Sequence, residues 1–260
     1  MSTFVIPLNA FFEKKPLWEE LSNALSIIGE SKADGVEIRR ELLTDNCIPT
    51  ELQLINAHLQ SKPLFAIYSA PIPLWNEDGY LNTIELSSIF KESDIISAKM
   101  VKLPLGHYHQ TKSNMKLLGD FLQEHPSISL VIENDQTVSG GKIRPLLQFF
   151  KSVFSNDIPI RMTFDMGNWA FLQEDAIKAF SLFHSHIEYV HIKQVQPSNG
   201  NLQTLPIDCD KNELWKLINT YLSPSILKGL EFPINLSIQS INNQIDILSK
   251  QRWERTYAIN

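Results

Sequence analysis

Short apolar runs rich in β-branched residues alternate with longer amphipathic stretches along the whole chain, and this alternation limits the possible folds most strongly. The strand candidates number eight and occupy residues 3–9, 35–39, 64–69, 100–104, 128–133, 160–165, 187–193 and 227–232. Helical periodicity fills the intervals, at residues 16–29, 50–61, 80–96, 112–124, 142–154, 173–185, 211–222 and 236–251. Eight β–α units within 260 residues predict an α/β fold, a (β/α)8 TIM barrel that forms one domain over residues 1–260.

Four consecutive strand candidates in the second half of the chain end in residues of the types that bind metal ions. These residues are Glu133, Asp165, His191 and Glu231. Alternate side chains of a barrel strand point inward, and the carboxyl ends of all strands meet at one mouth, so the four side chains can converge. Three carboxylates and one imidazole suit a single divalent ion. The alternative, that each is an ordinary polar strand end facing water, requires the same coincidence four times in a row.

The overall composition disfavours several other classes of protein. A net charge of −6 argues against a nucleic acid partner, because phosphate binding relies on clustered Lys and Arg. No stretch approaches the roughly 18 apolar residues that a membrane span needs, so we expect no membrane partner. Cys47 and Cys209 lie far apart without CxxC spacing, which indicates neither a disulfide framework nor a zinc knuckle. Reduced thiols are typical of a cytoplasmic protein, which is the expected location.

Two connections are longer than a tight barrel needs. They are residues 70–79, APIPLWNEDG, and residues 194–210, QVQPSNGNLQTLPIDCD. Both follow the carboxyl end of a predicted strand, which is the face where TIM barrels place their sites. We therefore expect both to be loops that cover a substrate, with mobile surface loops as the alternative.

Five motifs carry a resemblance to a known superfamily: GVEIRREL at 35–42, LVIEN at 130–134, TFDMGNW at 163–169, YVHIK at 189–193 and LEFP at 230–233. Together they resemble the xylose isomerase-like TIM-barrel superfamily, which includes ketose 3-epimerases, sugar and sugar-phosphate isomerases, inosose dehydratases and endonuclease IV. The resemblance covers nearly the whole chain. It implies that one divalent ion is bound by the same four residues, Glu133, Asp165, His191 and Glu231. Mn²⁺ or Mg²⁺ is the expected ion, and Zn²⁺ or Co²⁺ also suits such ligands.

The resemblance also implies a reaction. Glu133 and Glu231 are the expected catalytic residues, one on each face of a ketose or sugar phosphate, where one removes a proton from carbon and the other returns one. The ion would stabilise the enediolate that forms in between. The expected function is therefore that of a metal-dependent sugar isomerase or epimerase. Its partner would be a small-molecule carbohydrate, and a homo-oligomer is left open.

Other functions stay open at this point. A dehydratase of a keto-polyol or cyclitol would use the same base and ion. An endonuclease IV-like DNA-repair phosphodiesterase is less favoured, because its zinc cluster needs additional histidines and Asn168 stands where one of them is expected. A non-catalytic binding protein is disfavoured because all four metal ligands are present. Asn168 and Gln194 depart from patterns common in the superfamily, so the identity of the substrate is left undecided.

Further residues are predicted to bind the substrate: Lys193, Lys102, Asn168, Asn9, Arg39 and Trp75. Lys193 shares the inward side of its strand with His191, and a lysine there would neutralise an enediolate or bind a phosphate, as would Lys102. Trp75 is expected to cover a sugar ring, or else to pack in the core. Arg39 has an alternative role too, in a buried structural ion pair with Glu37 at the barrel floor.

The sequence also contains an HxH motif after the fourth predicted strand, formed by His107 and His109. Such a pair can bind a second metal ion. Loop histidines without a ligand are the more common alternative.

Overall fold

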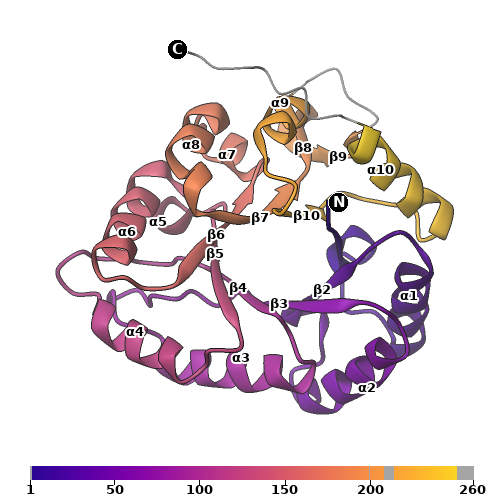
Figure 1. Cartoon of the computed structure of the whole chain (residues 1–260), viewed down its shortest axis with the longest axis horizontal. Coiled ribbons are helices and arrows are strands. Elements are labelled where there is room, and N and C mark those ends of the chain that lie inside the picture. The colour runs from indigo at the N-terminus through magenta and orange to yellow at the C-terminus, as the bar shows by residue number, and fades with distance from the viewer. Residues whose placement is uncertain (1, 199, 208–213, 251–260) are drawn as a thin grey trace.

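The computed structural model of the chain describes residues 2–198, 200–207 and 214–250. At its centre lies a closed barrel of eight parallel strands, with helices around it (Figure 1). The barrel strands are β1 (Phe4–Pro7), β2 (Gly35–Arg39), β3 (Phe65–Ser69), β4 (Met100–Pro104), β5 (Ser129–Glu133), β6 (Ile160–Asp165), β7 (Ile187–Ile192) and β10 (Leu227–Leu230). Around the barrel they follow the order β1-β10-β7-β6-β5-β4-β3-β2. The predicted (β/α)8 barrel is confirmed.

The outer ring consists of helices that return the chain from one strand to the next. They are α1 (Trp18–Glu30), α2 (Ile48–Gln60), α3 (Thr83–Ile95), α4 (Met115–Gln123), α6 (Ile143–Ser155), α8 (Ala176–Phe183), α9 (Leu214–Tyr221) and α10 (Ile238–Lys250). Shorter helical segments are η1 (Leu8–Ala10), η2 (Arg40–Leu42), α5 (Val138–Gly141), α7 (Asn168–Phe171) and η3 (His184–His186). Side-chain caps fix some helix starts: the Asn114 side chain accepts from the Leu117 amide at the start of α4.

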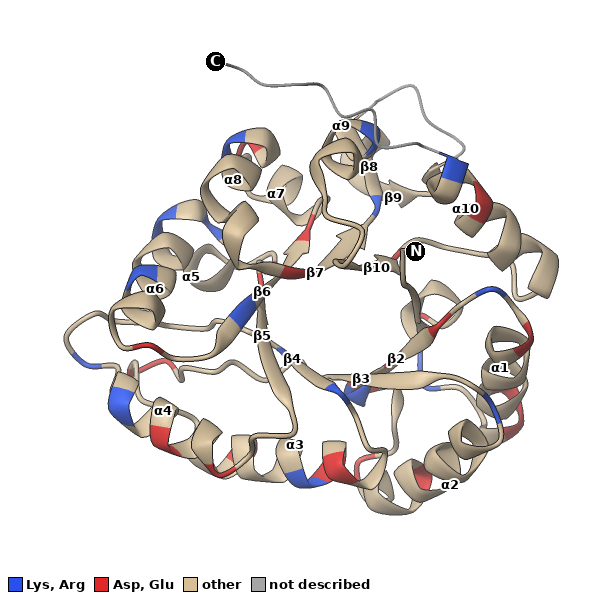
Figure 2. Ribbon diagram, in the orientation of Figure 1, with Lys and Arg blue, Asp and Glu red and all other residues tan. Residues whose placement is uncertain are grey.

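Acidic and basic positions are interspersed around the outer ring of helices (Figure 2). Some form exposed pairs, such as Lys116 with Asp120 one turn later on α4, and pairs of this kind add little to stability. None of the described helices is both long enough and apolar enough to cross a membrane.

All eight predicted strands are present, and three of them, 35–39, 100–104 and 160–165, have the predicted bounds. Each predicted helix overlaps an observed one, although residues 211–213 and 251 lie outside the described part of the chain. The prediction of a loop over 194–210 is wrong in part. This stretch contains an antiparallel hairpin of β8 (Gln194–Ser198) and β9 (Asn201–Leu205), in which Gly200 has a φ of +83°. Residues 208–210 of the same stretch lie outside the described residues.

Two separate apolar cores result from the alternation of side chains along the strands. Outward-facing strand residues pack against the helices in a large core. A small inner cluster fills the barrel and consists of Val5, Ile67, Met100, Val131 and Tyr189. Because parallel barrel strands bury both faces, strands such as β1 (FVIP) and β5 (SLVIE) are mostly apolar up to their last residues. The polar residues that end the strands therefore lie at the carboxyl-terminal mouth of the barrel.

Candidate metal centre

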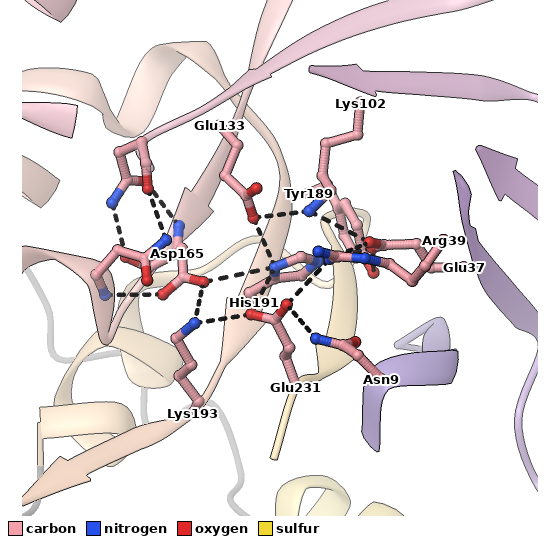
Figure 3. A network of polar contacts seen from close by, with 12 residues as sticks. Asn9, Glu37, Arg39, Lys102, Glu133, Asp165, Tyr189, His191, Lys193 and Glu231 are labelled. Carbon is pink, nitrogen blue, oxygen red and sulfur yellow. Dashed lines mark hydrogen bonds and ion pairs between the residues drawn. The ribbon is translucent and has the colours of Figure 1, made fainter. Parts of the chain in front are cut away.

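The four predicted metal ligands converge at the carboxyl-terminal mouth of the barrel (Figure 3). Glu133 and Asp165 are the last residues of β5 and β6, His191 lies near the end of β7, and Glu231 directly follows β10. The strand register aligns Asp165 with His191. One ligand atom from each of the four residues lies within 4.8 Å of the others. The inward convergence that the side-chain alternation predicts is therefore present.

The ligand atoms surround a common point in a way that fits a metal ion. His191 Nδ1 lies 2.9 Å from Glu133 Oε1, 3.1 Å from Glu231 Oε2 and 3.6 Å from Asp165 Oδ2. His191 Nδ1 and Asp165 Oδ2 are both buried, and neither makes a hydrogen bond of acceptable geometry within the described part of the chain. Buried polar atoms without a well-formed hydrogen bond are rare in folded proteins, and these two, although they contact charged side chains, fit the role of metal-ligand atoms. Three oxygen donors and one nitrogen suit Mn²⁺, Mg²⁺, Zn²⁺ or Co²⁺.

Local hydrogen bonds turn the Asp165 carboxylate toward the other ligands. Its Oδ1 accepts from the backbone amides of Gly167 and Asn168, both at 2.9 Å, which leaves Oδ2 directed at His191. The Asn134 side chain bridges β5 and β6, because it donates to the Asp165 carbonyl and accepts from the Asp165 amide. The residue after Glu133 thereby fixes the strand that carries the second ligand.

Glu37 lies beneath the ligands, fully buried, and contacts four donors, three through hydrogen bonds and Lys102 through an ion pair. Its Oε1 is 3.0 Å from Arg39 Nη1 and 3.2 Å from Lys102 Nζ. Its Oε2 is 2.8 Å from both the Tyr189 hydroxyl and His191 Nε2. Burial raises the pKa of Glu37, but Lys102, His191 and Arg39 outweigh it and hold that pKa well below the usual value.

The two candidate catalytic carboxylates each have a cation of their own. Lys102 Nζ donates to Glu133 Oε1 at 2.8 Å, and Arg39 Nη1 donates to Glu231 Oε1 at 3.1 Å. Burial raises the pKa of Glu133, yet Lys102 and His191 lower it to about 2. The pKa of Glu231 is likewise well below its usual value, because His191 and Lys193 outweigh burial. Both carboxylates are therefore ionised at neutral pH, as metal ligands and general bases must be.

Lys193 points inward, as its place two residues beyond His191 predicts. Its Nζ lies 2.6 Å from Asp165 Oδ2 and 2.8 Å from Glu231 Oε2. Burial lowers the pKa of Lys193, but these two carboxylates raise it above the usual value. The ammonium is therefore charged, and it lies at the edge of the ligand group.

A cavity of about 560 Å³ opens above the ligands. Glu133 and Glu231 line it, as do three of the residues predicted to bind a substrate, Arg39, Lys193 and Asn168. Asn9 also lines the cavity and donates from Nδ2 to Glu231 Oε1 at 3.0 Å. Further polar lining comes from Glu13, Ser69, Asp135, Gln136 and Thr204, and apolar lining from Ala70, Pro71, Pro104, Phe232 and Pro233.

Comparison with known proteins gives structural matches only. No protein-family model matches the sequence, and no curated protein does. A xylose isomerase domain-containing protein from Salmonella typhimurium LT2 superposes with a TM-score of 0.71 at 13% identity, over 96% of this chain and 98% of that one. The IOLI protein with a zinc atom bound gives a TM-score of 0.69 at 12% identity, over 96% of each chain. A D-psicose 3-epimerase studied in the presence of D-fructose gives 0.64 at 10% identity, over 95% and 98%.

The chain has the TIM-barrel fold of these solved structures. The resemblance inferred from the five sequence motifs is thereby confirmed for the fold. A probable 3-DHS dehydratase from Bacillus anthracis and endonuclease IV from Thermus thermophilus share this fold, at 12% and 14% identity. Because such different reactions occur on one scaffold, the reaction must be argued from the residues of the site.

Two predicted substrate residues lie elsewhere in this TIM barrel. Trp75 is fully buried in the core against Tyr108, with ring centroids 5.9 Å apart, and it does not line the cavity. Its backbone bonds to Leu105 and His107 draw the segment after β3 onto the end of β4, so the indole cannot cover a sugar ring. Lys102 is 1% exposed and is held beneath the cavity by Glu37 and Glu133, which corrects the prediction of a direct substrate contact.

The HxH motif does not form a second metal group. Among the described residues, one group of three or more metal-ligating side chains is found, and it contains neither His107 nor His109. His109 Nδ1 instead lies 3.1 Å from the Thr111 hydroxyl. The alternative of unliganded loop histidines therefore fits.

Sequence reasoning missed several residues of the site. Asp135 lies two positions beyond Glu133, and the same parity argument that placed Lys193 would have found it. Thr204 comes from β9, whose position depends on a hairpin that we predicted as a loop. Tyr189 shares the inward side of β7 with His191 by the same parity, but its bond to Glu37 spans 152 residues of sequence and leaves no local signal.

Proposed function

We propose that this chain is a metal-dependent sugar isomerase or epimerase, with Glu133 and Glu231 as its acid–base residues. One observation carries the proposal: these two carboxylates belong to a four-residue metal-ligand group and also line one cavity of about 560 Å³. A sugar in that cavity would meet the ion and both carboxylates at once. Mn²⁺ or Mg²⁺ is the first choice of ion, because three of the four ligands are carboxylates.

Glu133 and Glu231 differ in the number of side chains that donate hydrogen bonds to them. Glu231 accepts from three side chains, those of Asn9, Arg39 and Lys193, whereas Glu133 accepts a hydrogen bond from Lys102. Glu133 is thus the less encumbered base. The proton delivered on the other face would come from the Lys193 ammonium, 2.8 Å from Glu231 Oε2, and pass through Glu231, while Arg39 balances the carboxylate charge. When bound, a divalent ion would polarise a substrate carbonyl and so acidify the neighbouring carbon.

The lining of the cavity favours a neutral sugar over a sugar phosphate. Among the described residues, the basic side chains that line it are Arg39 and Lys193, and each already lies within 3.2 Å of two or more carboxylate oxygens. The rim adds the carboxylates of Glu13 and Asp135. Carboxylates accept hydrogen bonds from sugar hydroxyls, whereas they repel a phosphate group.

A dehydratase is the second candidate, and the position of Lys193 favours it. The Lys193 ammonium lies on the cavity wall 2.8 Å from Glu231, where it can donate a proton to a departing hydroxyl group. An endonuclease IV-like function fits less well. The side-chain amide of Asn168, which stands in place of an expected histidine, bonds to Asn134 and Gln136, and Asn168 is not one of the four metal-ligand residues.

Hydrogen exchange with solvent tests the proposal. The Mn²⁺-loaded protein would be incubated with neutral ketoses in D2O, and deuterium at the carbon beside the carbonyl would be followed by NMR. We expect incorporation without loss of water from the substrate. Loss of water from the sugar would instead identify the dehydratase.

Two substitutions assign the bases in the same assay. Glu133→Gln and Glu231→Gln should each slow exchange by a factor of about 100 or more, because an amide cannot accept the proton. Metal content must be measured alongside, and Glu92→Gln, which changes a buried glutamate on the outer side of the barrel, serves as the matched control. Undiminished exchange in metal-loaded Glu133→Gln and Glu231→Gln proteins would refute the assignment.

A further inference from the structure

Glu37 lies between the metal-ligand group and the apolar cluster inside the barrel, and it bonds to one residue of each, His191 and Tyr189. It is 0% exposed and does not line the cavity, so no substrate can reach it. Below it lies the inner cluster to which Tyr189 belongs. Above it lies His191, whose ring packs edge-on against that of Tyr189, with centroids 4.8 Å apart.

Three of the four side chains that contact Glu37 connect it to the metal-ligand group (Figure 3). His191 is itself a ligand and bonds Glu37 through Nε2. Lys102 bridges Glu37 and Glu133, at 3.2 and 2.8 Å. Arg39 bridges Glu37 and Glu231, at 3.0 and 3.1 Å.

We propose that Glu37 is the positioning residue of the metal centre, through which three of its four ligands are set. Its bond to His191 Nε2 keeps the ring proton on that nitrogen, which leaves the lone pair of Nδ1 directed at the ion. Its charge also holds Lys102 and Arg39 in place beneath Glu133 and Glu231. This inference rests on the metal site and not on the particular reaction proposed above.

The arrangement cannot tolerate an amide in place of the carboxylate. Each oxygen of Glu37 faces two donors, so the NH2 group of a glutamine would face two donors whichever way the amide turned. The loss of one negative charge would also deprive Lys102 and Arg39 of a carboxylate that each of them pairs with. Both effects oppose metal binding.

A matched pair of variants separates this role from ordinary structural stabilisation. Glu92, on α3, is also a buried carboxylate bonded by an arginine and a tyrosine: Arg40 Nε at 2.8 Å, Arg40 Nη2 at 3.0 Å and the Tyr68 hydroxyl at 2.7 Å. This cluster lies outside the metal group. Glu37→Gln and Glu92→Gln therefore remove the same charge from similar surroundings.

The test is calorimetric titration of the metal-free proteins with Mn²⁺, together with their melting temperatures. Glu37→Gln should weaken Mn²⁺ binding by a factor of 10 to 100, the usual effect of losing a ligand's hydrogen-bond partner. Glu92→Gln should leave the affinity within about twofold, although both variants should melt earlier than wild type. Wild-type affinity in Glu37→Gln, or an equal loss in both variants, would overturn the proposal.

Glu37→Asp keeps the test decisive if Glu37→Gln does not fold. This variant retains the negative charge but has a shorter side chain. Its carboxylate would lie farther from His191 Nε2 and would still balance the charges of Lys102 and Arg39. We expect a smaller loss of Mn²⁺ affinity than in Glu37→Gln, and wild-type affinity here would likewise count against a positioning role. These experiments measure Mn²⁺ binding and not catalysis. The positioning role of Glu37 and the proposed isomerase reaction can therefore be refuted independently of each other.

Discussion

Gly229 on β10 shows how closely the metal centre is packed at the scale of single residues. A Cβ atom at this position would lie 2.9 Å from His191 Cδ2 and would press on the Tyr189 hydroxyl. Both neighbours are held by Glu37, so neither can move aside without breaking a buried hydrogen bond. Glycine is thus required for the approach of β10 to β7, and not for a special backbone angle.

We expect Gly229→Ala to destabilise the metal-free protein by about 1–3 kcal/mol, the usual effect of overpacking, and to weaken metal binding. Gly119→Ala is the matched control, because it lies inside α4, where the nearest atom to an added Cβ, on Ile158, is 3.7 Å away. That variant should gain about 0.5–1 kcal/mol, since alanine favours helix. Urea unfolding of both variants measures the change in the free energy of unfolding relative to wild type. An unchanged free energy of unfolding in Gly229→Ala would contradict the packing argument.

At the residue scale, the alternation of side-chain direction along each strand was enough to predict the metal-ligand site from the sequence. The inward side of Glu133, Asp165, His191 and Glu231 follows from alternation along a strand, which needs no knowledge of the rest of the fold. Of the two roles predicted for Trp75, packing in the core is the one that fits, and the sequence could not choose because the burial of Trp75 depends on how a long segment packs against β4. Long-range packing of this kind has no period in the sequence.

The β8–β9 hairpin is the main departure from a plain barrel at the scale of elements. It follows β7 directly, pairs only with itself, and brings Thr204 to the cavity. Because neighbouring residues of a strand face opposite sides, Gln203 points away from Thr204 and is exposed. The hairpin thus offers one residue to a substrate while its neighbour faces solvent.

We expect Thr204→Val to raise KM for the sugar by about 3- to 10-fold with little change in kcat, because one hydrogen bond that binds substrate and transition state alike would be lost. Gln203→Ala is the neighbouring control and should stay within about twofold of wild type. Steady-state kinetics on the substrate found by deuterium exchange would decide. Equal KM values for Thr204→Val and wild type would mean that the hairpin does not contact the sugar.

Strands were predicted better than loops because β-branched runs between Gly, Pro and polar residues mark them locally. The hairpin was missed since its strands, QVQPS and NLQTL, are polar and short. Its turn was nevertheless visible in the sequence, as the Asn199–Gly200 pair is a strong hairpin signal. A better reading of turn residues would have found it.

The charge balance of the whole barrel mouth depends on the ion. Four carboxylates, the buried ones of Glu37, Asp165 and Glu231 and the partly buried one of Glu133, face three cations, Arg39, Lys102 and Lys193. In the metal-free protein His191 supplies the remaining positive charge. Burial lowers its pKa, but Glu231 and Glu37 outweigh burial and raise that pKa well above the usual value. A metal ion must therefore displace the His191 proton.

This exchange of proton for metal predicts a pH dependence. A raised folded-state pKa stabilises the metal-free fold below the unfolded value of about 6.5, and that stabilisation is lost as pH rises through the raised pKa. Mn²⁺ competes with fewer protons as pH rises. We therefore expect the increase in melting temperature on adding Mn²⁺ to be larger at pH 8 than at pH 6. A shift that is equal at both pH values, or larger at pH 6, would contradict the role of His191 as a ligand.

Metal content tests the central claim most directly. Elemental analysis of the wild-type protein, reconstituted with Mn²⁺ and freed of excess ion, should find close to one ion per chain. His191→Ala should retain far less, because it removes the nitrogen donor on which the other three ligands converge. Equal metal content in the two proteins, or no ion in the wild type, would contradict the account.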